Sequence, residues 1–119
     1  MVGDIGTPAG ARLAVDTAID AFGRVDLLCN NAAAHPMEQI AEHGLETWRE
    51  AFRVNVDGAM LCSQAALPHM KKQGGGAIVN IGSISGAVPY AGGGAYADDE
   101  EVGGPGGCGS AAECIGFRS

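Results

Sequence analysis

The chain has 119 residues and a formal net charge of −7; 46% of its residues are hydrophobic and 18% are charged. These values fit one globular domain and exclude an intrinsically disordered chain. The acidic balance disfavours nucleic acid and anionic membrane surfaces as partners. No apolar run approaches the roughly 20 residues of a membrane span, and the start of the chain does not resemble a secretory signal. We therefore expect a cytoplasmic protein that contacts neither nucleic acid nor membrane.

The residues that most often bind metals show no ligand spacing. The cysteines and histidines are Cys29, Cys62, Cys108, Cys114, His35, His43 and His69. No cysteine pair has the CxxC spacing of a zinc or redox site, and two of the cysteines lie inside apolar segments, where Cys packs as a small hydrophobe. We expect structural cysteines and no metal site.

The first helix and the strand after it have clear boundaries in the sequence. Thr7 is a suitable N-cap, Pro8 suits the first helical position, and Gly23 is typical of a helix end. The mostly apolar run 25–29 that follows reads as a buried parallel strand.

A second helix–strand pair follows. Helical periodicity extends from Leu45 to Gln73, with Gly58 and Pro68 as interruptions that predict a bend or break. Three glycines then lead into the apolar strand 77–81. Helix, strand, helix, strand with short connections predicts an α/β fold, the central βαβ portion of a Rossmann-like, doubly wound parallel sheet.

The character of the chain changes after Ala97. Residues 98–119 hold an acidic block and then a glycine-rich stretch with neither helical nor strand periodicity. We expect a partial domain over residues 1–97 and a disordered tail over 98–119.

Five short motifs occur in order along the first of these segments. They are Asp4-Ile5, the Asn30-Asn31-Ala32-Ala33 loop after the first strand, Asn55 in an Asn-x-x-Gly pattern, Ser83 after the second strand, and Tyr96 thirteen positions further on. Each is weak alone, but their order and context are specific. Residues 4–97 resemble the classical short-chain dehydrogenase/reductase family.

The resemblance implies an oxidoreductase that transfers hydride between NAD or NADP and a small alcohol or carbonyl substrate. It marks Asn55, Ser83 and Tyr96 as catalytic. Tyr96 would exchange the proton, Ser83 would hydrogen-bond the substrate oxygen, and Asn55 would hold a relay water. Asp4, Ile5, Asn30, Ala32 and Tyr96 would contact the cofactor. The helical stretch 45–73 resembles the helix through which family members dimerise, so self-association is expected.

Local structural roles are the alternative for two of these residues. Taken without the pattern, Ser83 is a turn or N-cap hydroxyl, and Asn55 is an amide at a helix kink. Tyr90, beside Pro89, reads as a loop aromatic.

The chain departs from the family pattern in two ways that bear on catalysis. The glycine-rich phosphate loop is expected before Asp4, where this chain has only three residues, and the position of the catalytic lysine holds Glu100. A tyrosine has an unperturbed pKa of about 10 and needs a cation beside it to act near neutral pH, whereas a carboxylate has the opposite effect. We expect this chain to be inactive. The alternative to an enzyme is a non-catalytic remnant, at most a fragment that binds a partner.

A reading-frame change after Ala97 is a hypothesis that explains both Glu100 and the altered tail. Codons for Asp98, Asp99, Glu100 and Glu101, read one base later, encode Thr or Met twice and then Lys or Arg. Removing one base before Asp98 therefore allows a lysine at position 100.

Overall fold

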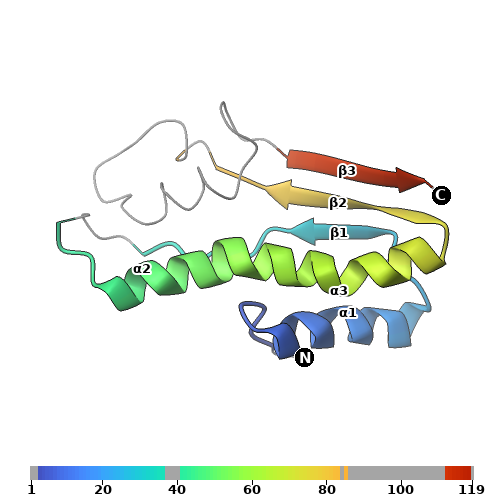
Figure 1. Cartoon of the computed structure of the whole chain (residues 1–119), viewed down its shortest axis with the longest axis horizontal. Helices are drawn as coiled ribbons and strands as arrows, with labels where there is room; N and C mark the ends of the chain where they lie inside the picture. The colour runs from blue at the N-terminus through green and yellow to red at the C-terminus, as the bar shows by residue number, and fades with distance from the viewer. Residues whose placement is uncertain (1–2, 37–40, 84, 86–111, 119) are drawn as a thin grey trace.

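A computed structural model describes residues 3–36, 41–83, 85 and 112–118 (Figure 1). Its elements, in chain order, are α1 (Pro8–Phe22), β1 (Leu27–Asn30), α2 (Leu45–Phe52), the π-helix η1 (Arg53–Asp57), α3 (Gly58–Lys72), β2 (Gly75–Ile81) and β3 (Ala112–Arg118). The three strands form one sheet in the order β1-β2-β3. Helix α3 contacts β1 and β2, and α1 packs against α3.

Helix α1 begins and ends at the residues that the sequence predicted. The Thr7 Oγ1 accepts a hydrogen bond from the Gly10 N–H at 3.1 Å, and Pro8 occupies the first turn. At the other end Gly23 has a φ of 79° and donates its N–H to the Ile19 carbonyl at 2.7 Å. This left-handed conformation is accessible to glycine without a steric cost, so the helix stops there.

Strands β1 and β2 are parallel neighbours, which confirms the predicted α/β arrangement. Leu27 pairs with Ala77, and Asn30 pairs with Asn80. Strand β1 starts two residues later than the sequence suggested. The reason is visible at Val25, whose N–H and carbonyl bond to the Gln73 side chain at 3.3 and 2.6 Å rather than to a strand.

The expectation of a tail without strands does not hold at Ala112–Arg118. This segment forms β3 and pairs antiparallel with β2, with Gly75 opposite Arg118 and Ile81 opposite Ala112. Strand β2 has a second edge of backbone N–H and carbonyl groups, and these accept a strand through backbone hydrogen bonds that require no side-chain period. The rest of the predicted tail, residues 98–111 and 119, lies outside the described residues.

The predicted long helix is present, and its distortion lies just before Gly58. Helix α2 passes directly into the π-helix η1, which passes into α3, and α3 continues through Pro68 to Lys72. A π-helix adds a residue to the turn and often marks a functional site. Gly58 follows η1 directly and packs closely, since a Cβ on it would lie 3.0 Å from the Ile5 Cδ1.

The core of the described chain lies between the two long helices and the sheet. Its buried members are Val15, Ala66, Met70 and Ile78, and Met70 is fully buried. Gly76 lies against this methionine, and a Cβ there would lie 2.6 Å from the Met70 Cγ. The core therefore fixes β2 against α3.

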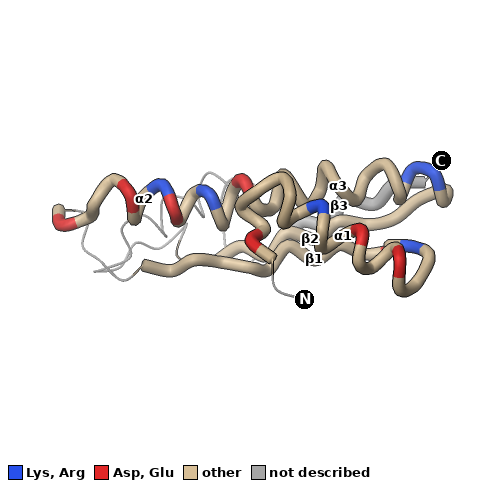
Figure 2. Tube along the Cα trace, turned by 90° about the horizontal axis from the view of Figure 1, so that it is seen from below, with Lys and Arg blue, Asp and Glu red and all other residues tan. Residues whose placement is uncertain are grey.

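Among those described, charged residues occur in the helices, the turns and β3, whereas β1 and β2 carry none. Figure 2 shows acidic and basic residues interspersed along α2 and η1, with Lys71 and Lys72 at the end of α3. In the part of the chain that the structure describes, no helix has both the length and the apolar character needed to cross a membrane.

Candidate active site

The carboxyl ends of the two parallel strands meet in a pair of asparagines. The Asn30 Nδ2 donates to the Asn80 Oδ1 at 2.8 Å and to the Ser63 Oγ at 3.2 Å. It also lies 3.4 Å from the Ala59 carbonyl oxygen. Ligands of open α/β sheets bind outside this edge. Asn30 thus joins the end of β1 to β2 and to α3 at the place where a ligand is expected.

Asn55 fixes the loop that follows β1. Its Oδ1 accepts the Ala34 N–H at 2.6 Å, and its Nδ2 donates to the Ala34 carbonyl at 3.0 Å. Both halves of the amide side chain are therefore bonded to one residue of the loop, and the group is half-buried. Asn55 is the third of the five residues of η1, so the π-helix positions it under the loop that carries Ala32.

Ser83 lies two residues beyond the end of β2 and makes local contacts. Its Oγ lies 3.0 Å from the Ser85 Oγ and accepts the Ser85 N–H at 3.2 Å. These are the contacts of a turn hydroxyl, as those of Asn55 are the contacts of an amide at a helix distortion. The local roles considered for both residues are present in the structure, and they fix where each side chain lies.

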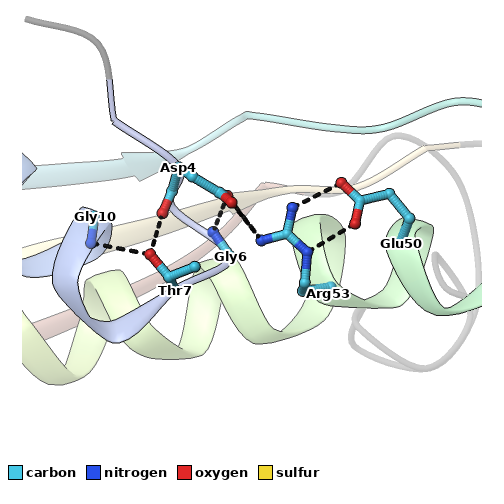
Figure 3. A network of polar contacts seen from close by, with 6 residues as sticks. All are labelled: Asp4, Gly6, Thr7, Gly10, Glu50 and Arg53. Carbon is cyan, nitrogen blue, oxygen red and sulfur yellow. Dashed lines mark hydrogen bonds and ion pairs between the residues drawn. The ribbon is translucent and has the colours of Figure 1, made fainter.

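Asp4 lies in a turn before α1 and is bonded to η1 (Figure 3). The Arg53 Nη1 donates to both Asp4 carboxylate oxygens at 2.8 Å, and the Gly6 N–H donates to the Asp4 Oδ1 at 3.0 Å. These hydrogen bonds favour the ionised form, so the pKa of the Asp4 carboxyl lies below its ordinary value. Ile5, the next residue, packs toward Gly58 at the other end of η1.

The structure brings several of the predicted site residues together around η1. Asn55 holds the loop that follows Asn30 and contains Ala32, while Asp4 and Ile5 contact the two ends of the same π-helix. Ser83 follows Asn80, the partner of Asn30, on β2. Tyr96 and Glu100, together with Tyr90, lie outside the described residues.

Comparison with known proteins identifies the family. The sequence profile of the short chain dehydrogenases matches residues 1–98. The chain belongs to the short-chain dehydrogenase family. Its region of similarity ends one residue after Ala97, where the sequence changes character.

Individual relatives support the same assignment. A protein of Streptomyces violaceoruber, named as a ketoacyl reductase of the granaticin polyketide synthase, is 42% identical over 89 residues, 72% of this chain and 36% of its own length. Meso-2,3-butanediol dehydrogenase of Serratia marcescens is 35% identical over 83 residues, which are 70% of this chain and 33% of that enzyme. The chain spans little more than a third of the length of such relatives.

A solved structure has the same fold. A short-chain dehydrogenase/reductase protein of Burkholderia xenovorans superimposes with a TM-score of 0.79 at 32% sequence identity, covering 87% of this chain and 41% of that one. The described α/β arrangement is thus part of a Rossmann-like fold of this family of oxidoreductases.

Three residues of the site were not singled out from the sequence. Asn80 and Ser63 bond the Asn30 side chain, and Arg53 bonds Asp4. A signal existed for Asn80, because it lies one residue before the end of the second apolar strand, while Asn30 ends the first. Arg53 follows Glu50 at i,i+3, a spacing that predicts their ion pair but not the contact with Asp4 49 positions away.

The start of α1 does not form a cradle for the pyrophosphate of a dinucleotide. There the Gly10 N–H is bonded to the Thr7 Oγ1, and the Asp4 carboxylate, just before the helix, accepts the Gly6 N–H. A helix N-terminus holds phosphate through unpaired N–H groups and positive potential, whereas this one is capped and follows a carboxylate. Within the described residues there is also no group of three or more His, Cys, Asp or Glu side chains suited to a metal ion.

Proposed function

We propose that residues 4–97 are the central part of an NAD(P)-dependent short-chain dehydrogenase/reductase that interconverts a small alcohol and its carbonyl compound. The observation that carries the proposal is the position of Asn55. It lies in a π-helix and binds the loop after β1 through both of its amide atoms, beside the sheet edge where Asn30 and Asn80 meet. Family membership supports the reaction class, and the general tendency of open α/β sheets to bind ligands outside the carboxyl ends of their strands supports a site at this edge.

The residues have separate roles in this proposal. Tyr96 transfers the proton to or from the substrate oxygen, and Ser83 hydrogen-bonds that oxygen. Asn55 keeps its side chain bonded to Ala34 and so holds the loop, and with it Ala32, in place. NAD or NADP supplies the hydride when it is bound to the complete protein. The start of α1 does not provide the phosphate contacts that it needs.

We further propose that the chain as printed does not catalyse the reaction. A carboxylate at Glu100 stands where a cation is needed to lower the pKa of a catalytic tyrosine. The second candidate is a non-catalytic remnant that binds a partner. It is favoured by exposed apolar side chains on the long helix, Leu45 at 60% and Met60 at 45% exposure, which also support self-association through residues 45–73. The free thiols of Cys29 and Cys62 agree with a cytoplasmic location.

The proposal is tested by offering NADH and NADPH with a panel of small carbonyl compounds, and NAD+ and NADP+ with the corresponding alcohols, to two proteins. One is the chain as printed, and the other is the gene product read in frame from upstream of Met1, where the glycine-rich loop is expected, with the frame also restored after Ala97. We expect turnover only from the frame-restored protein, with loss of turnover in its Tyr96→Phe variant. Saturable nucleotide binding with turnover by the printed chain would contradict inactivity. Absence of turnover in both proteins would favour the remnant, and light scattering would then report its association.

A further inference from the structure

The turn before α1 contacts both ends of the π-helix that carries Asn55. Asp4 and Gly6 contact Arg53, which is the first residue of η1. Ile5 contacts Gly58, which directly follows the last residue of η1. From this arrangement we infer that Arg53 is a positioning residue, which fixes η1 against the turn and thereby fixes where Asn55 holds the Ala34 loop. The inference rests on the proposed function for its relevance to catalysis, although the contacts themselves do not depend on it.

The guanidinium of Arg53 is bonded on two sides. Its Nη1 donates to both oxygens of Asp4, while its Nε and Nη2 each donate to one Glu50 oxygen at 2.7 Å (Figure 3). Three nitrogen atoms of one planar group are thus engaged by two carboxylates. These bonds fix the orientation of the planar guanidinium. A lysine ammonium, which is a point charge on a flexible side chain, would not be oriented in this way.

The turn that Arg53 binds is itself held rigidly. The Asp4 carbonyl accepts the Thr7 Oγ1–H at 2.8 Å and the Thr7 N–H at 3.1 Å, so the turn is continuous with the cap of α1. A methyl group on Gly10 would overlap the Asp4 carbonyl, and one on Gly6 would overlap the Arg53 guanidinium. The two glycines allow the turn to lie directly on α1 and on Arg53.

The two ends of η1 are therefore contacted by consecutive residues of one turn, with Asn55 between them. An isolated exposed ion pair contributes little to stability, so a purely local role predicts that removing Arg53 changes the turn alone. A positioning role predicts that removing Arg53 also changes the environment and the exchange rate of the Ala34 amide, although the bonds of Arg53 go to Asp4 and Glu50. The printed chain offers a matched control in Arg49, which pairs with Glu46 at i,i+3 on the same helix and is exposed.

The test compares Arg53→Ala with Arg49→Ala by amide NMR and hydrogen exchange in the whole chain. We expect Arg53→Ala to shift the Ala34 N–H and Asn55 side-chain amide signals and to speed Ala34 exchange about 3- to 10-fold, while Arg49→Ala leaves them unchanged. Arg53→Lys should fail to restore the signals, because it keeps the charge without the fork. Full rescue by lysine would overturn the role of the fork.

Asp4→Asn provides a second route if Arg53→Ala fails to fold. It is isosteric and removes the charge that the Arg53 Nη1 contacts, so the same shift at Ala34 is expected. Movement of the Gly6 signal alone, with Ala34 and Asn55 unchanged, would overturn the inference. None of these readouts uses a cofactor or turnover, so a failure of the proposed function would leave them unaffected.

Discussion

Replacing Asn55 with alanine removes both hydrogen bonds between η1 and the loop after β1. The bonds are 2.6 and 3.0 Å long and half-buried. A neutral hydrogen bond contributes about 0.5–1.5 kcal/mol net. Loss of both is therefore expected to lower the free energy of opening this loop by about 1–3 kcal/mol. At about 1.4 kcal/mol per factor of ten, Ala34 amide exchange should be about 5- to 150-fold faster.

Hydrogen exchange of the Ala34 amide measures this effect directly. The core amide of Ile78 serves as the internal reference, and Asn31→Ala in the same loop, whose side chain is exposed, serves as the matched control. Asn55→Asp adds a sharper test. It keeps an oxygen that accepts the Ala34 N–H but loses the donor to the Ala34 carbonyl, so Ala34 exchange should be slower than in Asn55→Ala and faster than in the unmodified chain. Equal Ala34 exchange in Asn55→Ala and the unmodified chain would refute the assigned role of Asn55.

Three further outcomes follow from the described contacts. Met70→Ala should lower the free energy of unfolding in urea by about 2–5 kcal/mol, and Met60→Ala, which truncates a half-exposed methionine on the same helix, by much less; equal losses would contradict the core assignment. Gly10→Ala should displace the Asp4 turn, seen as a changed Gly6 amide signal with the Ile78 signal retained. Hydrogen bonding to Arg53 lowers the pKa of the Asp4 carboxyl in the folded chain. The contact between Asp4 and Arg53 therefore stabilises the fold at pH values above the ordinary pKa of aspartate, and this stabilisation is lost as the pH falls through the lower pKa of the folded state. The Gly6 amide signal reports the titration of the Asp4 carboxylate that it bonds. Arg53→Ala should move the midpoint of this titration to higher pH, and an unchanged midpoint would refute Arg53 as the cause of the lowered pKa.

Much of the fold was predictable because its signals are local. Thr7, Pro8 and Gly23 mark the ends of α1 through cap and turn chemistry that depends on neighbouring residues only. The strand ends carrying Asn30 and the position of Asn55 also followed from short patterns. Strand β3 was not predictable in this way, since its pairing depends on the free edge of β2, more than 30 positions earlier in the chain.

The sequence predicts a set of site residues but not the contacts among them. The family resemblance assigns Asn30 and Asn55 to one site, whereas the bonds from Asn30 to Ser63 and Asn80 depend on how α3 crosses the strands. The Asp4–Arg53 contact joins residues 49 positions apart, and no periodicity links them. Such contacts follow from tertiary packing, which a single sequence specifies only through its fold.

We propose that this chain carries the site of a short-chain dehydrogenase in which a change of reading frame has replaced the catalytic lysine. The most direct measurement is the DNA sequence of codons 96–101 from the source. We expect one additional base after the codon for Ala97, whose removal places a lysine at position 100. DNA that encodes the printed residues with GAG for Glu100 would give arginine in the shifted reading, and would contradict the hypothesis.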